Sequence, residues 1–294
     1  MRGTWTRSGA AIAVALGSVI AVLSAQAQPA DVNDVLARAA ARVEEYISRA
    51  QRIVLVERTF IQHIRSDLTP LGFARVLESD LRVESEPPDG DSDTVPEARV
   101  VREIRRVNGH RPRAKDSQDC LDPNPISPEP LAFLLPAQRS KYAFTWAGPG
   151  KGKDKHAVMI DFKELGTKPP EVKEHGDKVQ EGCFSIDLPG RVRGCVWLDA
   201  LTYEVLRIDQ RVGSVDFRVP DSKYRRMGLS EWSALERLQT SIRYKPVAFR
   251  DPEETVLLPE SIDTLMIARG MQSYRMRQVF SDYRRFVTGA RLVK

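Results

Sequence analysis

Residues 193–212 read RGCVWLDALTYEVLRIDQRV, and this stretch decides the fold. It holds two strand-like segments, 193–199 and 203–212, on either side of the short connection 200–202. Successive side chains of a strand point to opposite faces, so Val196 and Leu198 share one face and Trp197 lies on the other. Two such segments around a short turn predict a pair of antiparallel strands.

The segments on either side of this pair have the same character. Strand signals run over 52–65, 74–84, 98–107, 141–147, 156–162, 182–188, 240–249, 260–268 and 273–286, with a short helix expected over 231–238. Short turns between successive strands favour an antiparallel meander. We find no repeat of fixed period, which argues against propellers and solenoids.

One amphipathic helix precedes the strands, over Asp31–Gln51. Val35, Leu36, Ala39 and Val43 recur at helical spacing, and charged residues fill the opposite face. Asp31 is a suitable N-cap. The fold class expected is therefore mainly β (α+β), with this helix packed on a sheet.

A proline-rich connection at 111–138 interrupts the strands. Its prolines exclude long strands or helices there, although 130–135 is compatible with one helical turn. Connections of this length are commonly functional or covering elements. We expect this one to lie across the mouth of a cavity.

The first 27 residues have the layout of a cleavable secretory signal. Arg2 and Arg7 precede an uncharged stretch of about 15 residues, shorter than the roughly 20 of a spanning helix, and Ala25-Gln26-Ala27 is a small-x-small cleavage site. We expect cleavage near Ala27, a single mature domain over 28–294, and a periplasmic or secreted protein.

The chain has three cysteines, Cys120, Cys183 and Cys195. Export to an oxidising compartment predicts one disulfide and one free thiol. Pairing of Cys183 with Cys195 across a hairpin is possible, but Cys120 lies in the proline-rich connection, which needs an anchor. We therefore favour Cys120–Cys183, with Cys195 as a small buried residue on a strand.

Composition and motifs exclude several function classes. The formal net charge is only +5, with both signs interspersed, which argues against nucleic acid as a partner. The histidines lie outside metal-ligand spacing, and the run 148–155 lacks the spacing of a phosphate-binding loop. No motif predicts a catalytic residue, a metal site or a cofactor, so the sequence indicates a protein that is not an enzyme.

Apolar strand faces supply the candidate ligand-binding residues. They alternate along three strand segments and comprise Tyr142, Phe144, Trp146, Val196, Leu198, Leu206 and Ile208. Such faces form either a closed core beneath the helix or the lining of a pocket for an apolar ligand, since burial of apolar area stabilises both. Periodicity leaves the two alternatives open.

The last strand segment is rich in arginine. Arg275, Arg277, Arg284 and Arg285 form either a solvated face or a contact with an acidic partner or with anionic lipid head groups.

The order of short motifs resembles that of a known superfamily. Gly194-Cys195-Val196-Trp197-Leu198-Asp199 is followed by Tyr203–Asp209, and later by Leu258-Pro259-Glu260-Ser261-Ile262 and Phe280-Ser281-Asp282-Tyr283-Arg284. This order resembles the LolA-like superfamily of periplasmic lipoprotein carriers, over about residues 31–285.

The resemblance implies a strongly curved antiparallel sheet, an incomplete β-barrel, with the N-terminal helix on its concave face. It also implies a non-enzymatic carrier or binding protein for a lipid or acylated, lipoprotein-like ligand. This chain is longer than a simple carrier and has fewer helices. The alternative is an interaction or sensor protein that binds another envelope protein, or a membrane surface, through its sheet edge and loops. The third hypothesis is an enzyme whose active-site residues are scattered along the sequence.

Overall fold

The computed structural model describes residues 31–50, 53–85, 98–113, 116, 120–122, 129–174, 184–219, 230–250 and 252–285. The expected signal at 1–27 and Cys183 lie outside these residues. The helices are α1 (Val32–Arg49), α2 (Glu129–Ala132), α3 (Pro136–Arg139) and the 3-10 helix η1 (Gly152–Asp154). The strands are β1 (Ile53–Ile64), β2 (Arg75–Ser85), β3 (Ala98–Val107), β4 (Tyr142–Pro149), β5 (Ala157–Glu164), β6 (Glu171–Glu174), β7 (Phe184–Asp187), β8 (Val192–Asp199), β9 (Val205–Val212), β10 (Val215–Arg218), β11 (Trp232–Arg250), β12 (Glu253–Arg269) and β13 (Ser273–Arg285).

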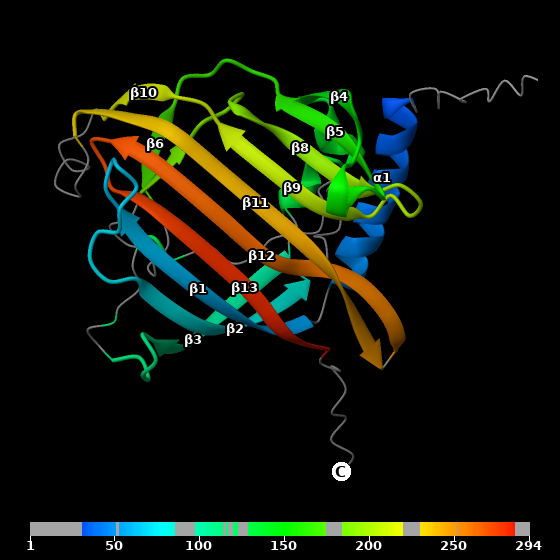
Figure 1. Cartoon of the computed structure of the whole chain (residues 1–294), viewed down its shortest axis with the longest axis horizontal. Coiled ribbons are helices and arrows are strands. Elements are labelled where there is room, and N and C mark those ends of the chain that lie inside the picture. The colour runs from blue at the N-terminus through cyan, green and yellow to red at the C-terminus, as the bar shows by residue number, and fades with distance from the viewer. Residues whose placement is uncertain are drawn as a thin grey trace, which may run out of the picture.

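One antiparallel sheet of 11 strands dominates the molecule. Its order is β3-β2-β1-β13-β12-β11-β9-β8-β5-β4, and β10 pairs with β11. Over the described residues the sheet stays open, with β3 at one edge and β4 at the other, and β6 and β7 form a separate two-stranded sheet. The expected antiparallel, mainly β fold is confirmed. In Figure 1, β11, β12, β13 and β1 run side by side across the front of the molecule.

Helix α1 begins and ends close to the predicted positions. The Asp31 side chain caps it by accepting a hydrogen bond from the Asn33 backbone N–H at 2.9 Å. Its buried residues, Val35, Leu36, Ala39, Ala40 and Val43, form one stripe. This stripe packs on the sheet. Among the described residues no helix has both the length and the apolar character that crossing a membrane requires.

The sheet curves around α1. Apolar residues of β4 share a core with the helix, and β2 does so at the other end of the sheet. In a flat sheet these strands would lie about 38 Å apart, whereas α1 is only about 27 Å long. The helix therefore occupies the concave side, as expected, and Figure 1 shows it behind the front strands.

The helix expected over 231–238 is wrong, because this segment is the first part of β11. Ala234 pairs with Arg269, Leu235 pairs with Ala268, and a bulge follows before Arg237. The extra residue of a bulge breaks the two-residue period of a strand. Three consecutive buried residues, 233–235, are then followed by two exposed ones, a spacing that imitates a helix.

The connection 111–138 contributes to the core in its described part. Leu131, Phe133, Leu134 and Leu135 are all buried and belong to the cluster that α1 forms with the sheet. The Arg139 guanidinium donates a hydrogen bond to the Leu36 carbonyl of α1 at 2.9 Å. In these residues, then, the connection fills space beside the helix. The expectation that it covers a cavity mouth stays a prediction.

Candidate functional site

The side chains expected to line a ligand cavity lie on the α1 side of the sheet. Val196, Leu198 and Ile208 are completely buried in the cluster with α1. Tyr142, Phe144 and Trp146 are half-buried against the same cluster, and the Phe133 ring stacks on Phe144 with a centroid distance of 6.3 Å. Leu206 is half-buried and is not part of this cluster. The structure thus brings most of these residues together, in contact with other protein side chains.

The hollows found beside α1 in the described part of the chain are small. One hollow of about 30 Å³ lies beside Val43 and Tyr46, and a second of about 30 Å³ lies beside Ala50 and Leu258. Pockets for small molecules usually measure about 300–1,000 Å³, and a water molecule occupies about 30 Å³ of liquid. Neither hollow admits an acyl chain in this structure. The ligand-lining role of the seven residues stays a prediction.

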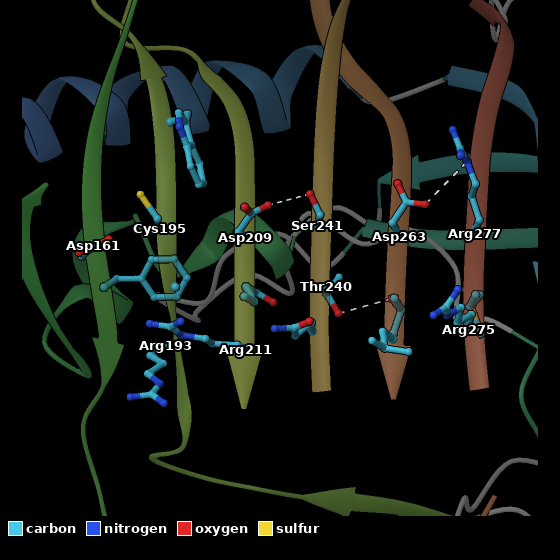
Figure 2. Close-up of a pocket in the computed structure, with 18 of the residues that line it drawn as sticks. Asp161, Arg193, Cys195, Asp209, Arg211, Thr240, Ser241, Asp263, Arg275 and Arg277 are labelled. Atoms are coloured by element: carbon cyan, nitrogen blue, oxygen red, sulfur yellow. Dashed lines mark hydrogen bonds and ion pairs between the residues drawn. The ribbon is translucent and has the colours of Figure 1, made fainter. Parts of the chain in front are cut away.

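A much larger hollow, of about 910 Å³, lies on the opposite face of the sheet. Trp197, Phe60 and Thr145 line it, whereas their strand neighbours on the α1 side do not. A strongly twisted sheet is saddle-shaped. The face opposite α1 is therefore convex in the direction across the strands but concave in the direction along them. We call this hollow the groove. Figure 2 views it with α1 behind the strands.

Two cross-strand rows of side chains form the groove. The strand register aligns the first row from β5 to β13: Asp161, Cys195, Asp209, Ser241, Asp263 and Arg277. Two residues further along each strand lies the second row: Lys163, Arg193, Arg211, Gln239, Leu265 and Arg275. Because side chains of paired residues in an antiparallel sheet point to the same face, each row is continuous across six strands.

Most carboxylates of the first row already have partners. Arg207 donates to Asp209 with two bonds of 2.9 and 2.5 Å, and the Ser241 hydroxyl donates to Asp209 at 2.7 Å. Asp263 faces Arg277 at 3.7 Å. Figure 2 shows the Ser241–Asp209 and Asp263–Arg277 contacts as dashed lines. The first row is therefore a largely neutralised polar strip.

Cys195 lies on a strand, β8, as expected, but it is only half-buried and faces the groove, so the expected full burial is corrected. It is a free thiol, as expected. Burial, together with a hydrogen bond to Asp161, raises the pKa of the Cys195 thiol to about 12. The thiol therefore stays protonated at neutral pH and is a poor nucleophile.

Apolar groups complete the groove at both ends. Trp197 lies on β8, and the Arg207 guanidinium stacks over its ring at 4.6 Å. At the other end Phe60 lies on β1 and half-buried Leu265 on β12. The groove thus combines charged rows with separate apolar surfaces. Within the described part of the chain, no cluster of three or more His, Cys, Asp or Glu residues could hold a metal ion.

Comparison with known proteins gives similarity at the level of structure. No protein-family model and no curated protein matches the sequence. The chain is similar to a LolA superfamily protein from Nitrosomonas europaea, with 8% identity, a TM-score of 0.34, and coverage of 88% of this chain and 97% of the other. It is also similar to a DUF1329 family protein from Desulfovibrio piger, with 10% identity, a TM-score of 0.38, and coverage of 88% and 95%.

Proposed function

We propose that this chain is an exported, non-enzymatic carrier or binding protein for a lipid or acylated ligand, and that the groove is its binding site. The observation that carries the proposal is the contrast between a groove of about 910 Å³ and hollows of about 30 Å³ beneath α1. Export after cleavage near Ala27, to the periplasm or beyond, is part of the proposal.

The groove suits an amphiphile because it offers two kinds of surface. Leu265 on β12 and Phe60 on β1 provide apolar contacts, and the charged residues of the two rows lie between and beside them. Each methylene buried there contributes about 0.8 kcal/mol, so six would contribute about 5 kcal/mol before the cost of immobilising the ligand. Since the groove is open, a ligand enters and leaves without disrupting the core, as a carrier requires.

The test fills the groove with a side chain. Ser241 lies on β11 near its centre, half-buried. The large ring of Ser241→Trp occupies part of the groove. The variant is therefore expected to weaken binding of monolauroyl glycerol, measured by calorimetric titration, by at least about tenfold, which corresponds to about 1.4 kcal/mol. Ser241→Ala is the matched control and should stay within about twofold of the wild type. Equal binding by the tryptophan variant would contradict the groove as the site.

The alternative, an envelope interaction or sensor protein, is favoured by one observation. Phe73 is fully exposed in the β1–β2 loop and Trp232 is 67% exposed at the start of β11. Both lie at the same end of the sheet, where Ile64 pairs with Ser273. Large exposed apolar residues mark contact sites when they cluster. If the wild-type protein bound no amphiphile in the titration above, the interaction or sensor protein would remain as the supported alternative.

Two sequence expectations are retained within the proposal. We propose that the mature chain is a single domain over 28–294, and the one sheet that joins β1 to β13 supports this. Cys120 pairs with Cys183, which is consistent with Cys195 as the free thiol.

A further inference from the structure

The second row of the groove places three cations on adjacent strands. Lys163 pairs with Arg193, and Arg193 pairs with Arg211. Neighbouring strands lie about 4.8 Å apart, so these side chains leave the sheet next to one another. All three are exposed in the groove, and Arg275 lies further along the same row beyond Gln239 and Leu265.

In the described part of the chain, the positive charges of these three side chains are not neutralised by ion pairs with carboxylates. Within the described part of the chain, no carboxylate oxygen lies within 4.0 Å of the basic groups of Lys163, Arg193 or Arg211. The carboxylates of the neighbouring first row have other partners: Asp161 accepts a hydrogen bond from the Cys195 thiol, Asp209 is engaged by Arg207 and Ser241, and Asp263 by Arg277. Like charges directly opposite each other destabilise a sheet, and a bound anion would relieve that repulsion.

We propose that Lys163, Arg193 and Arg211 bind the anionic head group of the ligand, a phosphate monoester. This inference rests on the proposed function, because it names the ligand class of the same groove. A carboxylate is satisfied by one arginine, which offers a matching pair of donors. Three adjacent cations match a dianion with three acceptor oxygens better.

The register also gives the direction of the acyl chain. Gln239 and Leu265 follow Arg211 in the row, and Phe60 lies beyond them on β1. Leu265 is two strands from Arg211, about 10 Å away. An acyl chain attached to the phosphate therefore runs over Leu265 and past the aliphatic stems of Arg275 and Arg277 on β13 towards Phe60, which pairs with Arg277.

The test compares two lipids with the same chain and different head groups. Wild-type protein is titrated with lauroyl lysophosphatidic acid, with uncharged monolauroyl glycerol and with inorganic phosphate. Hydrogen bonds to charged groups contribute enough to give a preference of roughly tenfold to hundredfold for the phospholipid. The preference should fall as salt is raised, because the cations are exposed.

The variant R193Q/R211Q should lose most of this preference and keep its affinity for monolauroyl glycerol. The matched control R106Q/R243Q removes two exposed arginines that do not line the groove. It should retain the preference for the phospholipid. Thermal unfolding of both variants verifies that they fold.

Each outcome decides between the proposals. Equal affinity for the two lipids, unchanged in R193Q/R211Q, overturns the anion site and leaves the proposed function standing. Absence of binding of both lipids to the wild type overturns the proposed function itself. Inorganic phosphate that binds as tightly as the phospholipid would show a site for the free anion and overturn the lipid head group as its ligand.

Discussion

Leu36→Ala is expected to lower the free energy of unfolding by about 3–5 kcal/mol, the range for a large residue removed from a packed core. Leu36 is 1% exposed on α1 and belongs to the same buried cluster as Val196 and Ile208. If α1 were a lid over an empty cavity, this side chain would have few partners and its removal would cost far less. Urea unfolding followed by circular dichroism measures the change.

Arg38→Ala is the control for this prediction. Arg38 lies two residues away on the solvent side of α1, where it pairs with Asp34 at 3.1 Å and lies over the Tyr203 ring at 5.2 Å; the side chains of Arg38 and Asp34 are more than half exposed. Its substitution should change stability by about 1 kcal/mol or less. A Leu36→Ala loss below about 1 kcal/mol would contradict a filled space beneath the helix.

Glu57→Gln is expected to cost about 3–5 kcal/mol, because it removes the charged carboxylate from a buried ion pair. Glu57 is 1% exposed on β1 and accepts hydrogen bonds from Arg102 at 2.8 and 3.1 Å and from Gln278 at 2.6 Å. These contacts join β1 to β3 and β13. Urea unfolding measures this loss as well.

Two further variants distinguish the stability contribution of the buried Glu57–Arg102 pair from that of an exposed ion pair. Glu78→Gln breaks the exposed contact with Arg106 and should cost about 1 kcal/mol or less. The double variant E57M/R102M should recover most of the stability, since apolar residues often replace a buried ion pair without loss. If Glu57→Gln proved no more costly than Glu78→Gln, the buried pair would have no structural role.

The sequence predicts the helix and most strands because each has a local period. Val35, Leu36 and Ala39 identify α1, and Val196, Leu198 and Trp197 identify the two faces of β8. The four-residue strands β6 and β10 are missed, whereas β7, which is equally short, falls within the expected segment 182–188. The start of β11 is mistaken for a helix because a bulge alters its period.

The groove could not be predicted from the sequence, for a different reason. Lys163, Arg193 and Arg211 belong to three strands, and each one alone looks like an exposed position on a half-buried strand. Only the register between β5, β8 and β9 brings them side by side. The free volume beneath α1 could not be predicted from the sequence either, because a filled core and a lipid cavity use the same apolar residues. The one available signal was Trp197, a large aromatic residue on the polar face of its strand.

The most direct test of the groove as binding site is photo-crosslinking with a lauroyl lipid that carries a diazirine at the end of its chain. Mapping of labelled peptides should place the label on groove residues such as Leu265 and Phe60. Label on α1 or on residues 131–135 instead, with Leu265 and Phe60 unmodified, would place the ligand beneath the helix and contradict this account.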